Sequence, residues 1–226
     1  MNVTGCALTW STGSAEDGGM RIVCISDTHT LHDEVDVPDG DLLIHAGDHC
    51  NRGTQSEVKR FDAWLAKQPH RHKVFIAGNH DWPWEKQSRY APMWIKSGAV
   101  YLRDKAVTVE GLKIYGSPWQ PEFCNWAFNL PRGRMLAHKW EQIPDDTDIL
   151  VTHGPPLDIL DRNRGDDRTG CADLAEALKR VRPRLHVFGH IHDGYGQVEQ
   201  DGTLFVNACA LDYEYEPVNP PIVVDL

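Results

Sequence analysis

Five short polar segments of the chain carry side chains of the types that most often bind metal ions. They read DTH at 27–29, GD at 47–48, GNHD at 78–81, HG at 153–154 and GHIH at 189–192. Each segment alone is a weak signal, because such short combinations occur by chance in many chains. Histidine, aspartate and asparagine together, with no cysteine among them, suit Zn, Mn, Fe or Ni and argue against a structural zinc site. The five segments together therefore predict a metal centre.

Each polar segment lies at the end of a short run of residues that favour β-strands. The runs cover 21–26, 41–47, 72–78, 148–154 and 185–190. They are rich in Val, Ile and Leu, which is typical of strands buried on both faces. Ligands of α/β proteins bind beyond the carboxyl ends of the strands, which is where these polar residues lie. Further candidate strands at 105–111, 112–117, 203–208 and 221–226 indicate a second sheet with antiparallel pairing, built from the pair at 105–116 and the last two runs.

Two segments are typical of amphipathic helices. The first begins at a capping box, in which Thr54 precedes Glu57 by three residues, and its apolar residues recur at helical spacing until Pro69. The second covers 171–182 and stops at Pro183. Strands that alternate with helices indicate βαβ units and therefore an α/β fold.

The composition is that of a globular protein. The chain has 226 residues, of which 41% are hydrophobic and 25% charged, and its formal net charge is −10. We expect a flexible leader over 1–19, which lacks the basic start and apolar core of a signal peptide, and one domain over 20–226. The charge argues against long nucleic acid as a partner, and no apolar run is long enough to cross a membrane. The six cysteines contain no CxxC pair, which favours reduced thiols and a cytoplasmic location.

The order of the polar segments, D-x-H, GD, GNH[DE], H and GHxH, resembles the signature of the calcineurin-like metallophosphoesterase superfamily. The segments IHAGD at 44–48, GSPWQPEF at 116–123, FNLPRG at 128–133 and THGPPLDILD at 152–161 are similar to one branch of it, the metallophosphoesterase-domain-containing proteins. The similarity covers nearly everything after residue 20. It implies a four-layer αββα sandwich with two mixed β-sheets.

The resemblance also implies a dinuclear metal site. Carried over by motif, the first metal is held by Asp27, His29 and His192, and the second by Asn79, His153 and His190, with Asp48 bridging both. A carboxylate shared between two cations holds them roughly 3.5–4 Å apart. We expect two divalent transition-metal ions, with Mn favoured and Fe, Zn, Ni or Co as alternatives. The complete GHIH motif predicts that both positions are filled.

Two residues next to these ligands have roles implied by the family. His80 follows Asn79 and is expected to act as a catalytic residue, which stabilises the transition state or protonates the leaving oxygen; the alternative is that it only orients Asn79. Asn79 and His80 would bind the phosphate, and Asp81 would position His80 as carboxylates do for imidazoles. His49, which directly follows Asp48, stands where we expect an apolar residue. We interpret it as a packing substitution, with an extra phosphate contact as the alternative.

Aromatic residues gather in two loop segments that follow motif strands. They are Trp82, Trp84, Trp119, Phe123, Trp126 and Phe128. We favour a packed cap that holds the loops, although aromatic side chains at a pocket rim can also stack on nucleobases.

The function implied by the resemblance is that of a metal-dependent phosphohydrolase. We expect above all a phosphodiesterase that acts on cyclic or small nucleotides, through in-line attack of a metal-bridging hydroxide. The alternatives are a broad phosphomonoesterase and a non-catalytic metal-binding scaffold for phosphorylated partners. The sequence leaves the physiological substrate, the native metal pair and the oligomeric state open.

Overall fold

Two mixed β-sheets form the centre of the computed structural model, which describes residues 19–226. The first sheet has the strand order β13 (Ile222–Asp225), β1 (Arg21–Ile25), β2 (Leu42–His45), β3 (His72–Phe75) and β4 (Val100–Tyr101). The second has the order β11 (Gly196–Gln200), β12 (Thr203–Asn207), β10 (Leu185–Phe188), β9 (Ile149–Thr152), β6 (Leu112–Ser117) and β5 (Lys105–Val109). A short pair, β7 (Gln120–Pro121) and β8 (Asn129–Leu130), lies apart from them. The expected leader over 1–19 lies outside the described residues except for Gly19.

Parallel strands occupy the centre of each sheet. Strands β1 to β4 run parallel in the first, and β6, β9, β10 and β12 run parallel in the second. Antiparallel strands form three of the four sheet edges, with β13 on β1, β11 on β12 and β5 on β6, and the parallel strand β4 forms the fourth. The five predicted motif strands therefore divide between the sheets, three in the first and two in the second.

One strand is placed differently from the prediction. The run at 221–226, expected in the second sheet, forms β13 in the first, where Val224 pairs with Ile22. The run at 203–208 does join the second sheet, as β12. Apolar periodicity shows that a strand is half-buried, but it does not specify the partner strand, which depends on contacts far apart in sequence.

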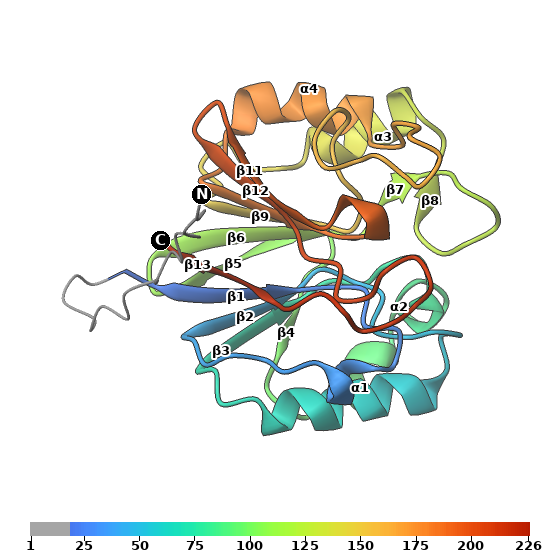
Figure 1. Ribbon diagram of the computed structural model, residues 1–226, viewed down its shortest axis with the longest axis vertical. Coiled ribbons are helices and arrows are strands. Elements are labelled where there is room, and N and C mark those ends of the chain that lie inside the picture. The colour runs from blue at the N-terminus through green and yellow to red at the C-terminus, as the bar shows by residue number, and fades with distance from the viewer. Residues whose placement is uncertain (1–18) are drawn as a thin grey trace, which may run out of the picture.

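The molecule has four layers, as the resemblance implies (Figure 1). An apolar core fills the space between the sheets, with Ile44 and Val74 from one and Val151 and Val187 from the other. Helices α1 (Gln55–Lys67) and α2 (Trp82–Lys86) cover the outer face of the first sheet. Helices α3 (Arg134–Trp140) and α4 (Ala172–Val181) cover the second. Single turns of 3₁₀ helix complete the secondary structure at His32–Glu34 (η1), Ala91–Trp94 (η2) and His192–Gly194 (η3).

Both predicted helices are present. The capping box of α1 is complete: the Thr54 hydroxyl accepts the Glu57 amide at 3.2 Å, and the Glu57 carboxylate accepts the Thr54 amide at 2.7 Å. Among residues 19–226, no helix is both long and apolar enough to cross a membrane.

Candidate metal centre

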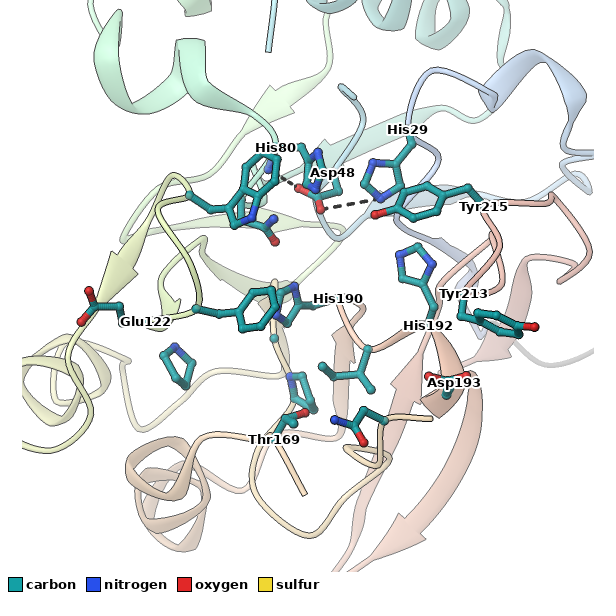
Figure 2. Close-up of a pocket in the computed structure, with 18 of the residues that line it drawn as sticks. His29, Asp48, His80, Glu122, Thr169, His190, His192, Asp193, Tyr213 and Tyr215 are labelled. Carbon is teal, nitrogen blue, oxygen red and sulfur yellow. Dashed lines mark hydrogen bonds and ion pairs between the residues drawn. The ribbon is translucent and has the colours of Figure 1, made fainter. Parts of the chain in front are cut away.

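The seven predicted metal ligands lie at the carboxyl ends of strands from both sheets. Asp27 and His29 follow β1, Asp48 follows β2 and Asn79 follows β3. His153 follows β9, and His190 and His192 follow β10. Oxygen or nitrogen atoms of Asp27, Asp48 and His153 all lie within 4.8 Å of one another, and Figure 2 shows Asp48, His29, His190 and His192 around one pocket. The two sheets thus each supply part of one polar cluster.

The contacts within the cluster can be followed through the two ligand groups that the resemblance implies. In the first, His192 Nε2 lies 3.6 Å from Asp27 Oδ1, and His29 Nε2 lies 3.8 Å from Asp48 Oδ2. In the second, His153 Nε2 lies 2.9 Å from Asn79 Oδ1, and the His153 and His190 rings are 5.0 Å apart. Asp48 Oδ2 is also 3.4 Å from His153 Nε2. This oxygen therefore lies between one histidine of each group.

These spacings fit the binding of metal ions. Two ligand atoms at about 2.1 Å from one cation lie about 3–4 Å apart at ordinary coordination angles, and the contacts of 3.4–3.8 Å are in that range. Both ring nitrogens of His29 and Asp27 Oδ1 are buried without a hydrogen-bond partner. Because unpaired buried polar atoms are costly, the convergence of these atoms fits a site for a cation. The ligand roles remain predictions that the geometry supports.

Neighbouring backbone groups orient the predicted ligands. His153 Nδ1 donates to the Ala46 carbonyl at 3.0 Å and His192 Nδ1 to the Asp212 carbonyl at 2.7 Å. A carbonyl can only accept, so in both rings Nε2 is the atom left to face the cluster. Asp27 Oδ2 accepts the His190 amide at 3.0 Å and the Cys209 thiol at 3.2 Å. Only Asp27 Oδ1 is left free for a metal.

The backbone that carries these ligands is strained. Asp27, His29, Asp48 and His190 have φ values of 51°, 39°, 55° and 70°, in a region that non-glycine residues adopt uncommonly. Such conformations persist only where the surrounding structure enforces them, and they cluster at functional sites. The first position of the GHIH motif requires glycine, because a Cβ at Gly189 would collide with Asp27 Oδ2.

Burial and the two carboxylates control protonation in the metal-free cluster. Burial lowers the pKa of His29 to about 4 and that of His190 to about 3. Burial also opposes the charged form of His153 and His192, but Asp48 and Asp27 outweigh it and raise the pKa of each histidine to about 9. In return, both aspartates keep a pKa below the usual range despite their burial. Cations that enter the cluster must therefore displace protons from His153 and His192.

His80 lies at the pocket in a defined tautomer. Its backbone amide donates to Asp48 Oδ1 at 2.8 Å, and its ring Nδ1 donates to the Asn51 carbonyl at 2.7 Å. Its ring stacks on Trp126 at 4.1 Å between centroids. Because Nδ1 carries the proton that Asn51 accepts, Nε2 is the ring atom free to exchange a proton with a bound molecule. This arrangement supports the catalytic role predicted for His80.

Asp81 is placed differently from the prediction, in which it positions His80. Its carboxylate is fully buried and accepts the backbone amides of Gly78, Asp48 and Cys50 at 2.8–2.9 Å. The contacts of His80 are with Asn51 and Trp126 instead. Burial and the charge of Asp48 raise the pKa of Asp81 to about 8. The three amides come from two loops, and sequence adjacency to His80 could not reveal that.

His49 is a packing residue, as the sequence favours. Its ring is fully buried, stacks on Phe61 at 4.2 Å and accepts the Trp84 indole N–H at 2.9 Å. It is not among the residues that line the pocket.

The pocket over the cluster has a volume of about 480 Å³. Of the aromatic residues that the sequence singled out, Phe123 and Trp126 line it, whereas Trp84 and Phe128 are fully buried. Trp84 and Phe128 thus pack the loops, whereas Phe123 and Trp126 are placed where a ligand could contact them.

Among the residues that sequence reasoning missed are Tyr213 and Tyr215, which line the pocket, and Cys209, which contacts Asp27. They follow β12, which carries none of the five metal motifs. The one available signal was the presence of aromatic residues in another loop after a strand.

Comparison of the sequence with known proteins identifies a matching family and several similar chains. The profile of the calcineurin-like phosphoesterases matches residues 20–194. The chain is 46% identical over 233 residues to the human and mouse metallophosphoesterase domain-containing protein 1, covering 92% of this chain and 72% of each relative. It is 39% identical over 228 residues to the UPF0046 protein C25E10.12 of Caenorhabditis elegans, covering 92% and 81% of the two chains.

Solved structures share the fold at low sequence identity. The protein TT1561 of Thermus thermophilus superposes with a TM-score of 0.54 at 16% identity, covering 84% of this chain and 88% of that one. A further crystal structure reaches a TM-score of 0.63 at 13% identity, covering 87% and 92%. At these identities, the likeness concerns the fold alone.

Proposed function

The chain belongs to the calcineurin-like phosphoesterase family, and we propose that it hydrolyses small phosphodiesters, cyclic or small nucleotides foremost, with two divalent transition-metal ions. Mn is the favoured metal. One observation carries the proposal: Asp48 Oδ2 lies between the histidines of two ligand groups, 3.8 Å from His29 and 3.4 Å from His153. A carboxylate in that position suits a bridge between two cations.

The metals, when bound, would supply positive charge for the phosphate oxygens and a water of lowered pKa as nucleophile. The chain's own residues do the rest. Asp27, His29 and His192 hold one ion, Asn79, His153 and His190 hold the other, and Asp48 holds both. Asn79 and His80 bind the phosphate. Because His80 Nδ1 donates its proton to the Asn51 carbonyl, the ring must first take up a second proton at Nε2, which it then gives to the leaving oxygen.

Preference for a diester with an organic leaving group is supported by the pocket. Its volume of about 480 Å³ extends beyond the polar cluster, and four aromatic residues line it. Phe123 is 60% exposed and Tyr215 is 45% exposed, so their rings are open to a bound molecule. Figure 2 shows the Tyr215 ring beside His29. Aromatic side chains hold bases by stacking, at about 1–3 kcal/mol per base. A nucleotide is therefore the substrate class that we favour.

A hydrolysis panel tests the proposal. Mn-loaded protein is assayed with bis-p-nitrophenyl phosphate, p-nitrophenyl phosphate and a set of cyclic and linear nucleotides, with Asp48→Asn as the inactive control. We expect higher kcat/KM for the diesters. Higher kcat/KM for monoesters would replace the proposal by a broad phosphomonoesterase. Tight phosphate binding with no turnover of any substrate would favour a non-catalytic scaffold.

We also propose a cytoplasmic location. The proposal is supported by the cysteines in residues 19–226, all five of which are free thiols, four of them buried. Disulfides are rare in reducing compartments. Fluorescence microscopy of the tagged full chain, with fractionation as a second measure, would test it.

A further inference from the structure

The loops that carry Asp48 and Asn79 are joined through a buried carboxylate. Asp48 follows β2 and Asn79 follows β3, and the two strands are parallel neighbours. Beyond the strand ends the ladder stops, so other groups must hold the loops together. Asp81 Oδ2 accepts the amides of Asp48 at 2.9 Å and Gly78 at 2.8 Å, and its Oδ1 accepts the amide of Cys50 at 2.9 Å. One carboxylate thus spans both loops.

His49 faces this carboxylate from the other side. Its Nε2 accepts the indole N–H of Trp84 at 2.9 Å, and because an indole N–H only donates, Nε2 carries no proton. The proton of the neutral ring is then on Nδ1, which lies 3.1 Å from Asp81 Oδ2. This N–H is not aligned for a hydrogen bond and has no other partner, so the contact is an electrostatic one at short distance, between a buried ring nitrogen and a buried carboxylate.

Trp84 and Phe61 hold the His49 ring in place. Trp84 is fully buried in α2 and packs on Tyr101 at 4.1 Å between ring centroids. Phe61 of α1 stacks on the other side of His49 at 4.2 Å and 15°. The imidazole is therefore wedged between the two helices that cover the first sheet, and its orientation is set by the core rather than by the pocket.

We propose that Trp84, His49 and Asp81 are positioning residues that set the spacing of Asp48 and Asn79 for metal binding. The chain of contacts runs from the core outward: Trp84 orients His49, His49 orients Asp81, and Asp81 holds the two loops by their amides. The inference rests on the proposed function only in assigning Asp48 and Asn79 as metal ligands. His49 does not line the pocket.

Another reading of the same residues is a separate cation site, because ligand atoms of His49, Cys50 and Asp81 lie within 4.8 Å of one another. The donors around Asp81 argue against it. Both carboxylate oxygens already accept backbone N–H groups, whose positive ends would repel a cation.

The test is the affinity of the full chain for Mn²⁺, measured by calorimetry or by the paramagnetic resonance of free Mn²⁺. His49→Phe keeps the ring packing but removes both nitrogens, and Asp81→Asn leaves the Cys50 amide facing an amide nitrogen. We expect each to weaken Mn²⁺ binding at least tenfold. His49→Asn, whose amide N–H can take the place of Nδ1, should restore affinity to within about threefold of wild type.

His32→Phe is the matched control, because His32 is another fully buried histidine beside Phe61, with ring centroids 5.8 Å apart, and has no contact with Asp81. Its Mn²⁺ affinity should stay within twofold of wild type. Folded His49→Phe with wild-type Mn²⁺ affinity would overturn the proposal. If His49→Phe does not fold, Asp81→Asn and His49→Asn decide in the same way.

A metal-free measurement separates this inference from the proposed function. Hydrogen exchange of the Asp48, Cys50 and Gly78 amides, followed by NMR, reports the loop contacts directly. We expect His49→Phe and Asp81→Asn to speed exchange of these amides at least tenfold and His32→Phe to leave it unchanged. Unchanged exchange in all variants would refute the positioning role, even if the protein proves to be an active phosphodiesterase. Faster exchange in a protein without Mn²⁺ binding would refute the function and keep the loop contacts.

Discussion

Asp48 contacts several other residues of the centre at once. Its Oδ1 accepts the His80 amide, its Oδ2 faces His29 and His153, and its own amide donates to Asp81. It adopts a φ of 55° and is buried. A carboxylate held in this way is pre-organised, so little freedom remains to be lost when ligands bind. In the proposed site the residue joins both ligand groups, so its loss should affect both.

Asp48→Asn is therefore expected to abolish hydrolysis and to lower the metal content at both positions. The amide keeps the shape but removes the negative charge that two cations would share. Elemental analysis of the purified variant measures this directly. His190→Ala is the comparison, and it should lose only the second metal. Two metals per chain in Asp48→Asn would contradict the bridging role.

His80 is expected to matter most for poor leaving groups. A ribose alkoxide needs a proton as its P–O bond breaks, whereas p-nitrophenolate leaves readily without one. General acid catalysis contributes about 10²–10⁴-fold, so His80→Gln should reduce kcat on a cyclic nucleotide by about that factor and on bis-p-nitrophenyl phosphate far less. The kinetics are compared at saturating Mn²⁺.

Equal losses of kcat on the two substrates would assign His80 to charge stabilisation of the phosphoryl oxygens, which does not depend on the leaving group. No loss on either would leave it with the role of orienting Asn79.

At the scale of elements, strand ends from the two sheets position the residues of the centre, and helices on the outer faces support the sheets. The parallel strands β1, β2 and β3 bring three ligand loops to one edge, and β9 and β10 bring two more across the interface. Helix α1 contributes Phe61, Trp64 and Leu65 to the core that supports the first sheet. Its N-terminal cap lies outside the pocket, so stability and activity should be separable there.

Thr54→Ala tests that separation. Loss of the capping hydroxyl should destabilise the protein by about 1 kcal/mol, which lowers the unfolding midpoint of a domain of this size by about 2–4 °C. Thermal unfolding followed by circular dichroism measures the shift, and kcat/KM should not change. Ser56→Ala, an exposed position in the same helix turn, is the control and should leave the midpoint within about 1 °C. A tenfold loss of activity in Thr54→Ala would mean that α1 is coupled to the centre.

At the scale of the molecule, the protein is acidic, with a net charge of −10. Two histidines of its polar cluster nevertheless bind protons when no metal is present. His153 and His192 have a pKa of about 9 in the metal-free protein, against about 6.5 in an unfolded chain. The folded state therefore binds more protons than the unfolded state between these values. By linkage, the stabilising contribution is complete below pH 6.5 and is lost as the pH rises through 9.

The metal-free chain should accordingly become less stable from pH 7 to pH 9, by about 4 kcal/mol for the two histidines together and so by roughly 10 °C in the unfolding midpoint, given about 2–4 °C per kcal/mol. The Mn-loaded chain should not, because metal replaces the two protons. Calorimetry in buffers of different ionisation enthalpy should also detect release of about two protons per chain on metal binding at pH 8. A flat midpoint in the metal-free chain, with no proton release, would contradict the raised pKa values.

The sequence by itself determined which types of side chain gather in the centre and which elements carry them. The five polar segments follow β-rich runs, and both predicted helices lie where capping residues and apolar spacing predict them. These features are readable because they are local: strand and helix periodicity, a capping box and a polar residue after a strand each depend on a few neighbouring residues.

Only the tertiary structure decided the contacts between distant segments. In the structure, β13 pairs with β1, and Tyr213 and Tyr215 line the pocket. Asp81 accepts the amides of two loops instead of contacting its neighbour His80. The tertiary structure also linked His49 to Trp84, 35 residues away. None of these partners can be read from local pattern, because a buried polar group takes whichever donor or acceptor the folded chain brings within reach. The sequence thus shows which polar side chain needs a hydrogen-bond partner, and the packing decides which group that partner is.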